Sequence, residues 1–153
     1  MFSIGRSKYA PGTMASFVTS IIFVFFYILQ INIIFLISFV IIIFIYSVYS
    51  IDIFESAFST IDAKEIVIDE FVGQSIPILT IYSLFLKNDI GNFMMYIIIS
   101  FFLFRIFDIL KPYPINKIDK DMKNGFGVML DDVIAGIYSS IVLLIIISFL
   151  HYE

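Results

Sequence analysis

Five long apolar stretches set the limits on what this chain can fold into. A membrane-spanning helix needs about 20 mainly apolar residues, and the second, fourth and fifth stretches meet that length. Hydrophobic residues make up 61% of the 153, against roughly 45–50% in an ordinary soluble domain, so a soluble core of this size could not bury them. We therefore predict an all-α, polytopic membrane helix bundle of about five helices, forming one domain over residues 1–153. The stretches are residues 14–29, 32–51, 71–86, 93–109 and 128–150.

Two of these stretches carry further signals. The short connection at residues 30–32 predicts that the first two helices form an antiparallel hairpin. The third stretch contains Gly73, Gln74 and Pro77, so we expect its helix to be kinked or broken.

The basic residues predict the orientation in the membrane. With a cytoplasmic N-terminus, five crossings place eight of the nine Lys and Arg residues in the cytoplasm and only Lys87 outside. The positive-inside rule therefore predicts a cytoplasmic N-terminus and an external C-terminus. Of the thirteen acidic residues, all but Asp89 and Glu153 fall on the same side. The rule does not require this of acids, so the acids need an explanation of their own.

One group of acids lies in KEIVIDEFVGQ, residues 64–74. Asp62, Glu65 and Asp69 recur at helical spacing, which predicts an amphipathic helix at the membrane surface with a solvated acidic face. Asp69 and Glu70 differ because they lie directly against the next apolar run. Ionisable residues at membrane depth are costly and usually face a polar cavity.

A second group lies in FRIFDILKPYPI, residues 104–115, where Arg105, Asp108 and Lys111 share roughly one helix face. The two cations could be membrane anchors with Asp108 as their ion-pair partner. That interpretation does not explain why Asp108 lies deeper than Lys111. Pro112 and Pro114 should end this helix.

The third group is Asp131 and Asp132 in GFGVMLDDVIAG, residues 125–136. They lie about a full turn inside a helix predicted to begin near Gly127. The helix dipole favours acids only in the first turn, whereas a bound divalent cation would give both carboxylates a partner.

These three groups together predict a metal site just under the cytoplasmic surface, held by Asp69, Glu70, Asp131 and Asp132. Ligation by oxygen alone suits Mg²⁺ or Mn²⁺ rather than zinc. Lys111, helped by Arg105, would neutralise a phosphate. Asp108 either completes the metal site or transfers a proton. This set of residue types is typical of metal-assisted phosphoryl chemistry on a lipid headgroup.

The N-terminal YAPGTMAS, residues 9–16, places Thr13 and Ser16 at the start of the first helix. Backbone N–H groups at such an end can hold an anion, and an ordinary N-cap fits equally well. We assign Thr13 and Ser16 to substrate binding, together with Lys64 and Glu65.

In the order and spacing of APGTMAS, EIVIDEFVG, FRIFDILKPYPI and GFGVMLDDVIAG, the chain resembles the phosphatidylglycerophosphatase A family. The resemblance implies a Mg²⁺-dependent phosphatase, multi-pass in the bacterial inner membrane with its active site facing the cytoplasm. Its substrate would be phosphatidylglycerophosphate, and its products phosphatidylglycerol and inorganic phosphate. Tyr113 stands where we expect tryptophan in many relatives, a change that keeps an amphipathic interfacial ring.

Several alternatives remain open. A small cation transporter would place acids near the bilayer midplane, and a Mg²⁺-dependent lipid headgroup transferase would carry a repeated Asp-rich motif that we do not find. We favour direct attack by a metal-activated water over an aspartyl phosphoenzyme. We expect no nucleic-acid partner, and the sequence does not predict an oligomeric state.

Overall fold

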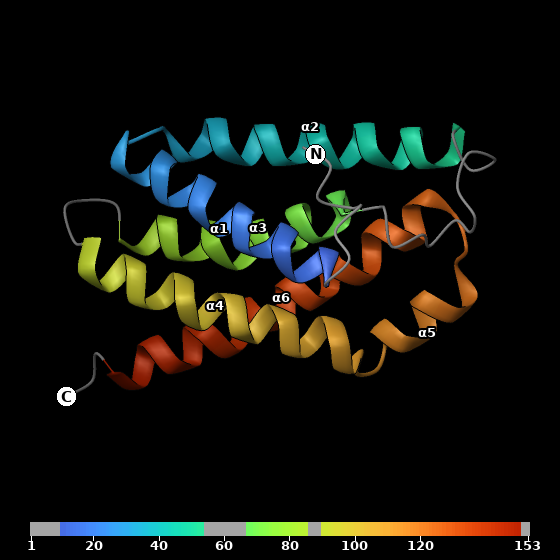
Figure 1. Ribbon diagram of the computed structural model, residues 1–153. Coiled ribbons are helices and arrows are strands. Elements are labelled where there is room, and N and C mark those ends of the chain that lie inside the picture. The colour runs from blue at the N-terminus through green and yellow to red at the C-terminus, as the bar shows by residue number, and fades with distance from the viewer. Residues whose placement is uncertain (1–9, 54–66, 86–89, 151–153) are drawn as a thin grey trace.

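The computed structural model describes residues 10–53, 67–85 and 90–150, and its regular elements there are all helices (Figure 1). The five predicted helices are confirmed. A sixth, α5, lies in the charged connection after α4 and was not predicted. The amphipathic surface segment expected before residue 67 lies almost wholly outside the described residues. The helices are α1 (Pro11–Ile28), α2 (Ile33–Ile53), α3 (Ile68–Leu84), α4 (Ile90–Leu110), α5 (Ile115–Asp121) and α6 (Gly125–Leu150).

Four of these helices, α1, α2, α4 and α6, are long and apolar enough to cross a membrane. Their outward faces carry large apolar side chains, and on α2 both Ile34 and Ile42 are more than 60% exposed. In water this would be a very large apolar surface, whereas in a bilayer it is the ordinary lipid-facing surface. The chain is therefore a membrane protein.

The five long helices run alternately in opposite directions, so that α1, α3 and α6 begin at the end of the bundle where α2 and α4 finish (Figure 1). The α1–α2 connection turns at Gln30, which has φ of 52°. The two helices are antiparallel as predicted, but they pack against α3 rather than against each other. All three sequence groups rich in acid consequently lie at one end of the bundle. Asp52, near the end of α2, helps to fix the start of α6 there, because its carboxylate accepts a hydrogen bond from the Gly125 N–H at 2.6 Å.

Helix α3 forms the centre of the bundle, in contact with α1, α2, α4 and α6. Its predicted break is absent, since one helix continues through Pro77. Proline is tolerated in a buried membrane helix where neighbouring helices and hydroxyl side chains satisfy the backbone. Pro77 has no N–H, so it leaves the Gly73 carbonyl without its helical donor, and this carbonyl lies against Gly136 of α6.

Candidate functional site

Two glycines bring the acidic segments of α3 and α6 together. A Cβ atom at Gly73 would lie 2.7 Å from the backbone carbonyl oxygen of Asp132, and one at Gly136 would overlap the Gly73 carbonyl. Small residues allow membrane helices to approach until their backbones touch. The two helices run in the same direction, so the side chains one turn before each glycine become neighbours. On α3 these are Asp69 and Glu70, and on α6 the neighbour is Asp132.

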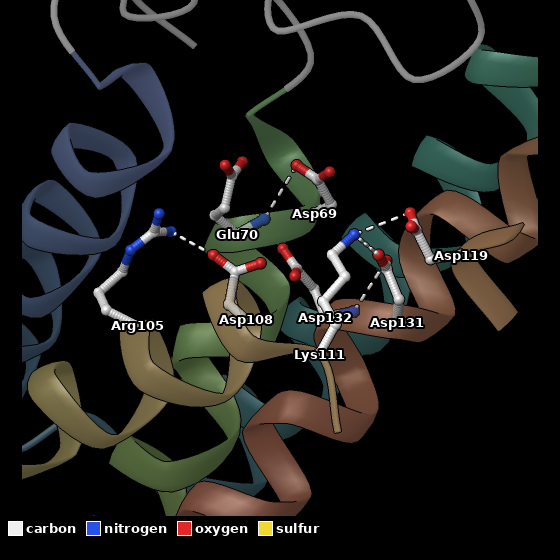
Figure 2. Close-up of polar contacts among 8 residues, drawn as sticks. All are labelled: Asp69, Glu70, Arg105, Asp108, Lys111, Asp119, Asp131 and Asp132. Carbon is white, nitrogen blue, oxygen red and sulfur yellow. Dashed lines mark hydrogen bonds and ion pairs between the residues drawn. The ribbon is translucent and has the colours of Figure 1, made fainter. Parts of the chain in front are cut away.

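The carboxylates of Asp69, Glu70 and Asp132 each offer an oxygen within 4.8 Å of the others, at the end of the bundle (Figure 2). Among the described residues, Glu70 Oε2 and Asp132 Oδ2 are buried without a hydrogen-bond partner. Unpaired buried charge is costly, and mutual repulsion adds to the cost. Carboxylate oxygens are the ligands that Mg²⁺ prefers in proteins. The residues present therefore fit a Mg²⁺ ion.

The helix dipole is a simpler explanation for buried acids, but it applies only to those in the first turn of a helix. Asp69 and Glu70 lie in the first turn of α3, where the helix dipole also favours negative charge. Helix α6 begins at Gly125, slightly earlier than predicted, and its first turn holds no acid. The dipole therefore does not account for the buried Asp132, which is 3% exposed.

Asp131 faces a different partner from its neighbour Asp132. Its Oδ2 lies 2.7 Å from Lys111 Nζ, and the same ammonium lies 2.8 Å from Asp119 Oδ1 on α5 (Figure 2). Burial disfavours the charged form of Lys111, but its hydrogen bonds to Asp119 and Asp131 outweigh that cost and raise its pKa above the ordinary value. Asp131 thus belongs to an ion-pair cluster beside the three converging carboxylates. Asp119 was not predicted as a site residue, because the charged connection after α4 carries no spacing signal.

Lys111 reaches this cluster because of its backbone. It follows the last residue of α4 with φ of 42°, and its N–H bonds the Phe107 carbonyl at 2.9 Å. A left-handed residue at this place ends a helix and satisfies one of its free carbonyl groups. The predicted end of α4 before Pro112 is confirmed.

Arg105 and Asp108 form the opposite side of the site. Arg105 Nη1 lies 2.7 Å from Asp108 Oδ2, as the ion-pair interpretation predicted. This contact is an ion pair without hydrogen-bond geometry. The buried Nε and Nη1 of Arg105 have no hydrogen-bond partner among the described residues. The first turn of α1 completes this side. A Cβ atom at Gly12 would overlap the Glu70 carboxylate and lie 3.2 Å from Arg105 Nη1.

The remaining predicted residues lie around this arrangement or outside it. Thr13 is half-buried in the first turn of α1. Ser16 is fully buried, and its hydroxyl donates to the Gly12 carbonyl at 3.0 Å. Neither caps α1, whose N-cap is Ala10 without a side-chain hydrogen bond. Lys64 and Glu65 lie outside the described residues. Gly12 was missed as a site residue, although the Pro-Gly pair before the first apolar run marks its position.

The sequence matches the family model described as phosphatidylglycerophosphatase A over residues 1–147. A Bacteroides thetaiotaomicron protein, provisionally named a phosphatidylinositol-3-phosphatase, is 35% identical over 93% of this chain and 86% of its own length. A phosphatidylglycerophosphatase A of Haemophilus influenzae is 48% identical over 53% of this chain and 45% of its own length. The phosphatidylglycerophosphatase A of Escherichia coli is 34% identical over 52% of this chain and 41% of its own length. The matches to the Haemophilus and Escherichia proteins therefore each span less than half of the relative. No solved structure matches the chain.

Proposed function

The chain belongs to the phosphatidylglycerophosphatase A family, and from this premise we propose that it is a Mg²⁺-dependent lipid phosphatase acting on phosphatidylglycerophosphate. The products are phosphatidylglycerol and inorganic phosphate, and the site faces the cytoplasm at a bacterial inner membrane. The observation that carries the proposal is the convergence of Asp69, Glu70 and Asp132 at one end of a membrane bundle, beside Arg105. A cation carrier needs its acids near the bilayer midplane, and the position of these acids argues against it.

In this proposal Asp69, Glu70 and Asp132 hold the Mg²⁺ ion, with Asp131 beside them. When bound, the ion supplies positive charge that stabilises phosphoryl oxygens and favours ionisation of an attacking water. Glu70 Oε2 and Asp132 Oδ2, which have no hydrogen-bond partner among the described residues, are the oxygens best placed to serve as ligands.

The two cations differ in how free they are to meet a phosphate. Lys111 already holds Asp119 and Asp131, so in this proposal it orients Asp131 and adds positive charge from one side. Arg105 is also ion-paired, with Asp108 at 2.7 Å, but its buried Nε and Nη1 have no hydrogen-bond partner in the described part of the chain. Charge-assisted hydrogen bonds from a guanidinium suit phosphate oxygens, and we assign this contact to Arg105.

Hydrolysis then requires three changes. The oxygen of a water molecule bonds to phosphorus and the water gives up one proton, the bond between phosphorus and the glycerol oxygen breaks, and that glycerol oxygen takes up one proton. Asp108, held by Arg105 at 2.7 Å, is positioned either to move a proton or to complete the metal site. A water nucleophile remains our preference over an aspartyl phosphoenzyme, because ligation and ion pairing already account for these acids.

Orientation follows from the charges at the same end of the bundle. The helix α5 and its flanks carry Lys111, Lys117, Lys120 and Lys123, and the positive-inside rule assigns such a connection to the cytoplasm. The acids and the substrate phosphate then share that face.

The test is phosphate release by the purified protein in detergent. Phosphatidylglycerophosphate should be hydrolysed with Mg²⁺ present, and EDTA should abolish turnover until Mg²⁺ is restored. Phosphatidylinositol-3-phosphate is the informative comparison, because the Bacteroides relative is named for that lipid. Turnover of the inositol lipid alone would overturn the assigned substrate. Full turnover after EDTA, with no metal found by elemental analysis, would overturn the assigned cofactor.

A further inference from the structure

An apolar groove runs between α1 and α4, separate from the carboxylates. Its volume is about 440 Å³, within the range of roughly 300–1,000 Å³ typical of small-molecule sites. Phe17 and Val24 mark its extent on α1, and Met94 and Phe102 mark it on α4. The lining includes Ser20, whose hydroxyl is used within α1 to donate to the Ser16 carbonyl at 3.0 Å. The groove therefore suits a hydrocarbon rather than a polar ligand.

The groove is aligned with the candidate site. Helices α1 and α4 run in opposite directions (Figure 1). The start of α1 and the end of α4 therefore lie at the same end of the groove. Gly12 and Arg105 are at that end, beside Glu70. The wall nearest to them includes Phe17 and Phe101, whose rings meet edge to face at 6.3 Å. One end of the groove thus approaches the polar site, and the other leads away from it along both helices.

The groove covers about 10 Å along α1, which is less than the thickness of one bilayer leaflet. Phe17 and Val24 lie five and twelve residues after Gly12, which at ~1.5 Å per residue is about 7.5 to 18 Å along the helix. One leaflet contributes about 15 Å of the ~30 Å hydrocarbon core. The groove therefore lies at the depth of the acyl chains in the leaflet that faces the carboxylates.

We propose that this groove holds one acyl chain of the phospholipid whose phosphate is hydrolysed at the carboxylate site. The inference rests on the proposed function, because an acyl chain here belongs to the substrate rather than to bulk lipid only if a phospholipid is hydrolysed at the carboxylate site. The side chains at its open face determine how much chain it admits. Ile21 and Ile98 lie there, 53% and 55% exposed. Chain binding in the groove would align the headgroup with Glu70 and Arg105, and so give the enzyme a preference for long-chain substrates.

The kinetic test fills the groove from its open face. Ile98→Trp should lower kcat/KM for dipalmitoyl relative to dihexanoyl phosphatidylglycerophosphate about tenfold, since roughly two methylene groups lose their burial. Ile42→Trp is the matched control, because Ile42 is 64% exposed on α2 and is not in the groove lining. It should leave the ratio unchanged. An unchanged ratio in a folded Ile98→Trp protein would overturn the proposal.

A crosslinking measurement tests acyl-chain binding in the groove independently of phosphate hydrolysis. Phosphatidylglycerol with a diazirine on one acyl chain carries no terminal phosphate, so its crosslinking does not depend on hydrolysis. Crosslinks should concentrate on the groove residues of α1 and α4 and be lost in Ile98→Trp but not in Ile42→Trp. Crosslinks spread evenly over the lipid-facing helices would show bulk lipid only and would overturn the proposal. Failure of the wild-type protein to release phosphate from any lipid would instead reject the proposed function.

Discussion

Replacing Gly73 by alanine should separate α3 from α6 where their backbones touch. The new Cβ atom would lie 2.7 Å from the Asp132 carbonyl oxygen and 2.6 Å from Cε2 of Phe104. Ordinary contact begins near 3.4 Å, so the new atom must gain about 0.7 Å from the carbonyl and about 0.8 Å from the ring. Phe104 is fully buried and has little room to move, so the α3 backbone must shift. That shift changes its spacing from Asp132, the residue that α6 contributes to the three carboxylates.

This displacement should reduce activity much more than it reduces folding. A misplacement of ~1 Å can cost about 100-fold in rate, so a shift of this size should lower kcat roughly 10- to 100-fold. Mg²⁺ affinity should fall as well, because the distances between carboxylates change. Overpacking typically costs about 1–3 kcal/mol of stability, which the long apolar helices should tolerate. Phosphate release, metal Kd and thermal unfolding in one detergent measure all three quantities.

Gly91→Ala is the matched control. Gly91 lies near the start of α4, and a Cβ atom there would meet no heavy atom of the described residues within 4 Å. It should leave kcat and metal Kd unchanged and should not lower stability, since alanine is the better helix former. Wild-type kcat and metal Kd in Gly73→Ala would refute the claim that the glycine contact sets the spacing of the carboxylates.

Three further predictions concern the site and its orientation. Asp132→Asn should weaken Mg²⁺ binding and lower kcat by orders of magnitude while leaving the fold intact, because removing one acid relieves repulsion; an unchanged metal Kd would exclude it as a ligand. Lys111→Met should reduce kcat about 100-fold or more without weakening Mg²⁺ binding, and Lys111→Arg should retain part of the activity; wild-type kcat in Lys111→Met would leave this residue only a structural ion-pair partner of Asp119 and Asp131. Since the chain has no cysteine, a single cysteine at Gln30 should label from outside intact cells and one at Lys117 should not; the reverse pattern would invert the proposed topology.

Some features of this protein follow from the sequence alone. The length of the apolar runs specifies membrane helices, since a helix needs a nearly fixed number of apolar residues to cross a bilayer. The order of the runs then places the acidic residues at one end, because each crossing reverses the direction of the chain. Asp69 and Glu70 at the start of one run, and Arg105 and Asp108 at the end of another, required no tertiary information. The break expected at Pro77 is absent, because this local signal was outweighed by four surrounding helices.

Other features were decided only by the tertiary structure. Asp131 and Asp132 are equivalent in the sequence, yet one pairs with Lys111 and the other joins the converging carboxylates. Successive residues of a helix point about 100° apart, so the partner of each depends on how α6 is rotated in the bundle. That rotation is set by the contact of Gly136 with the Gly73 carbonyl on α3. A one-dimensional pattern can place charged residues at the same membrane depth, but which of them meet depends on the close packing between helices.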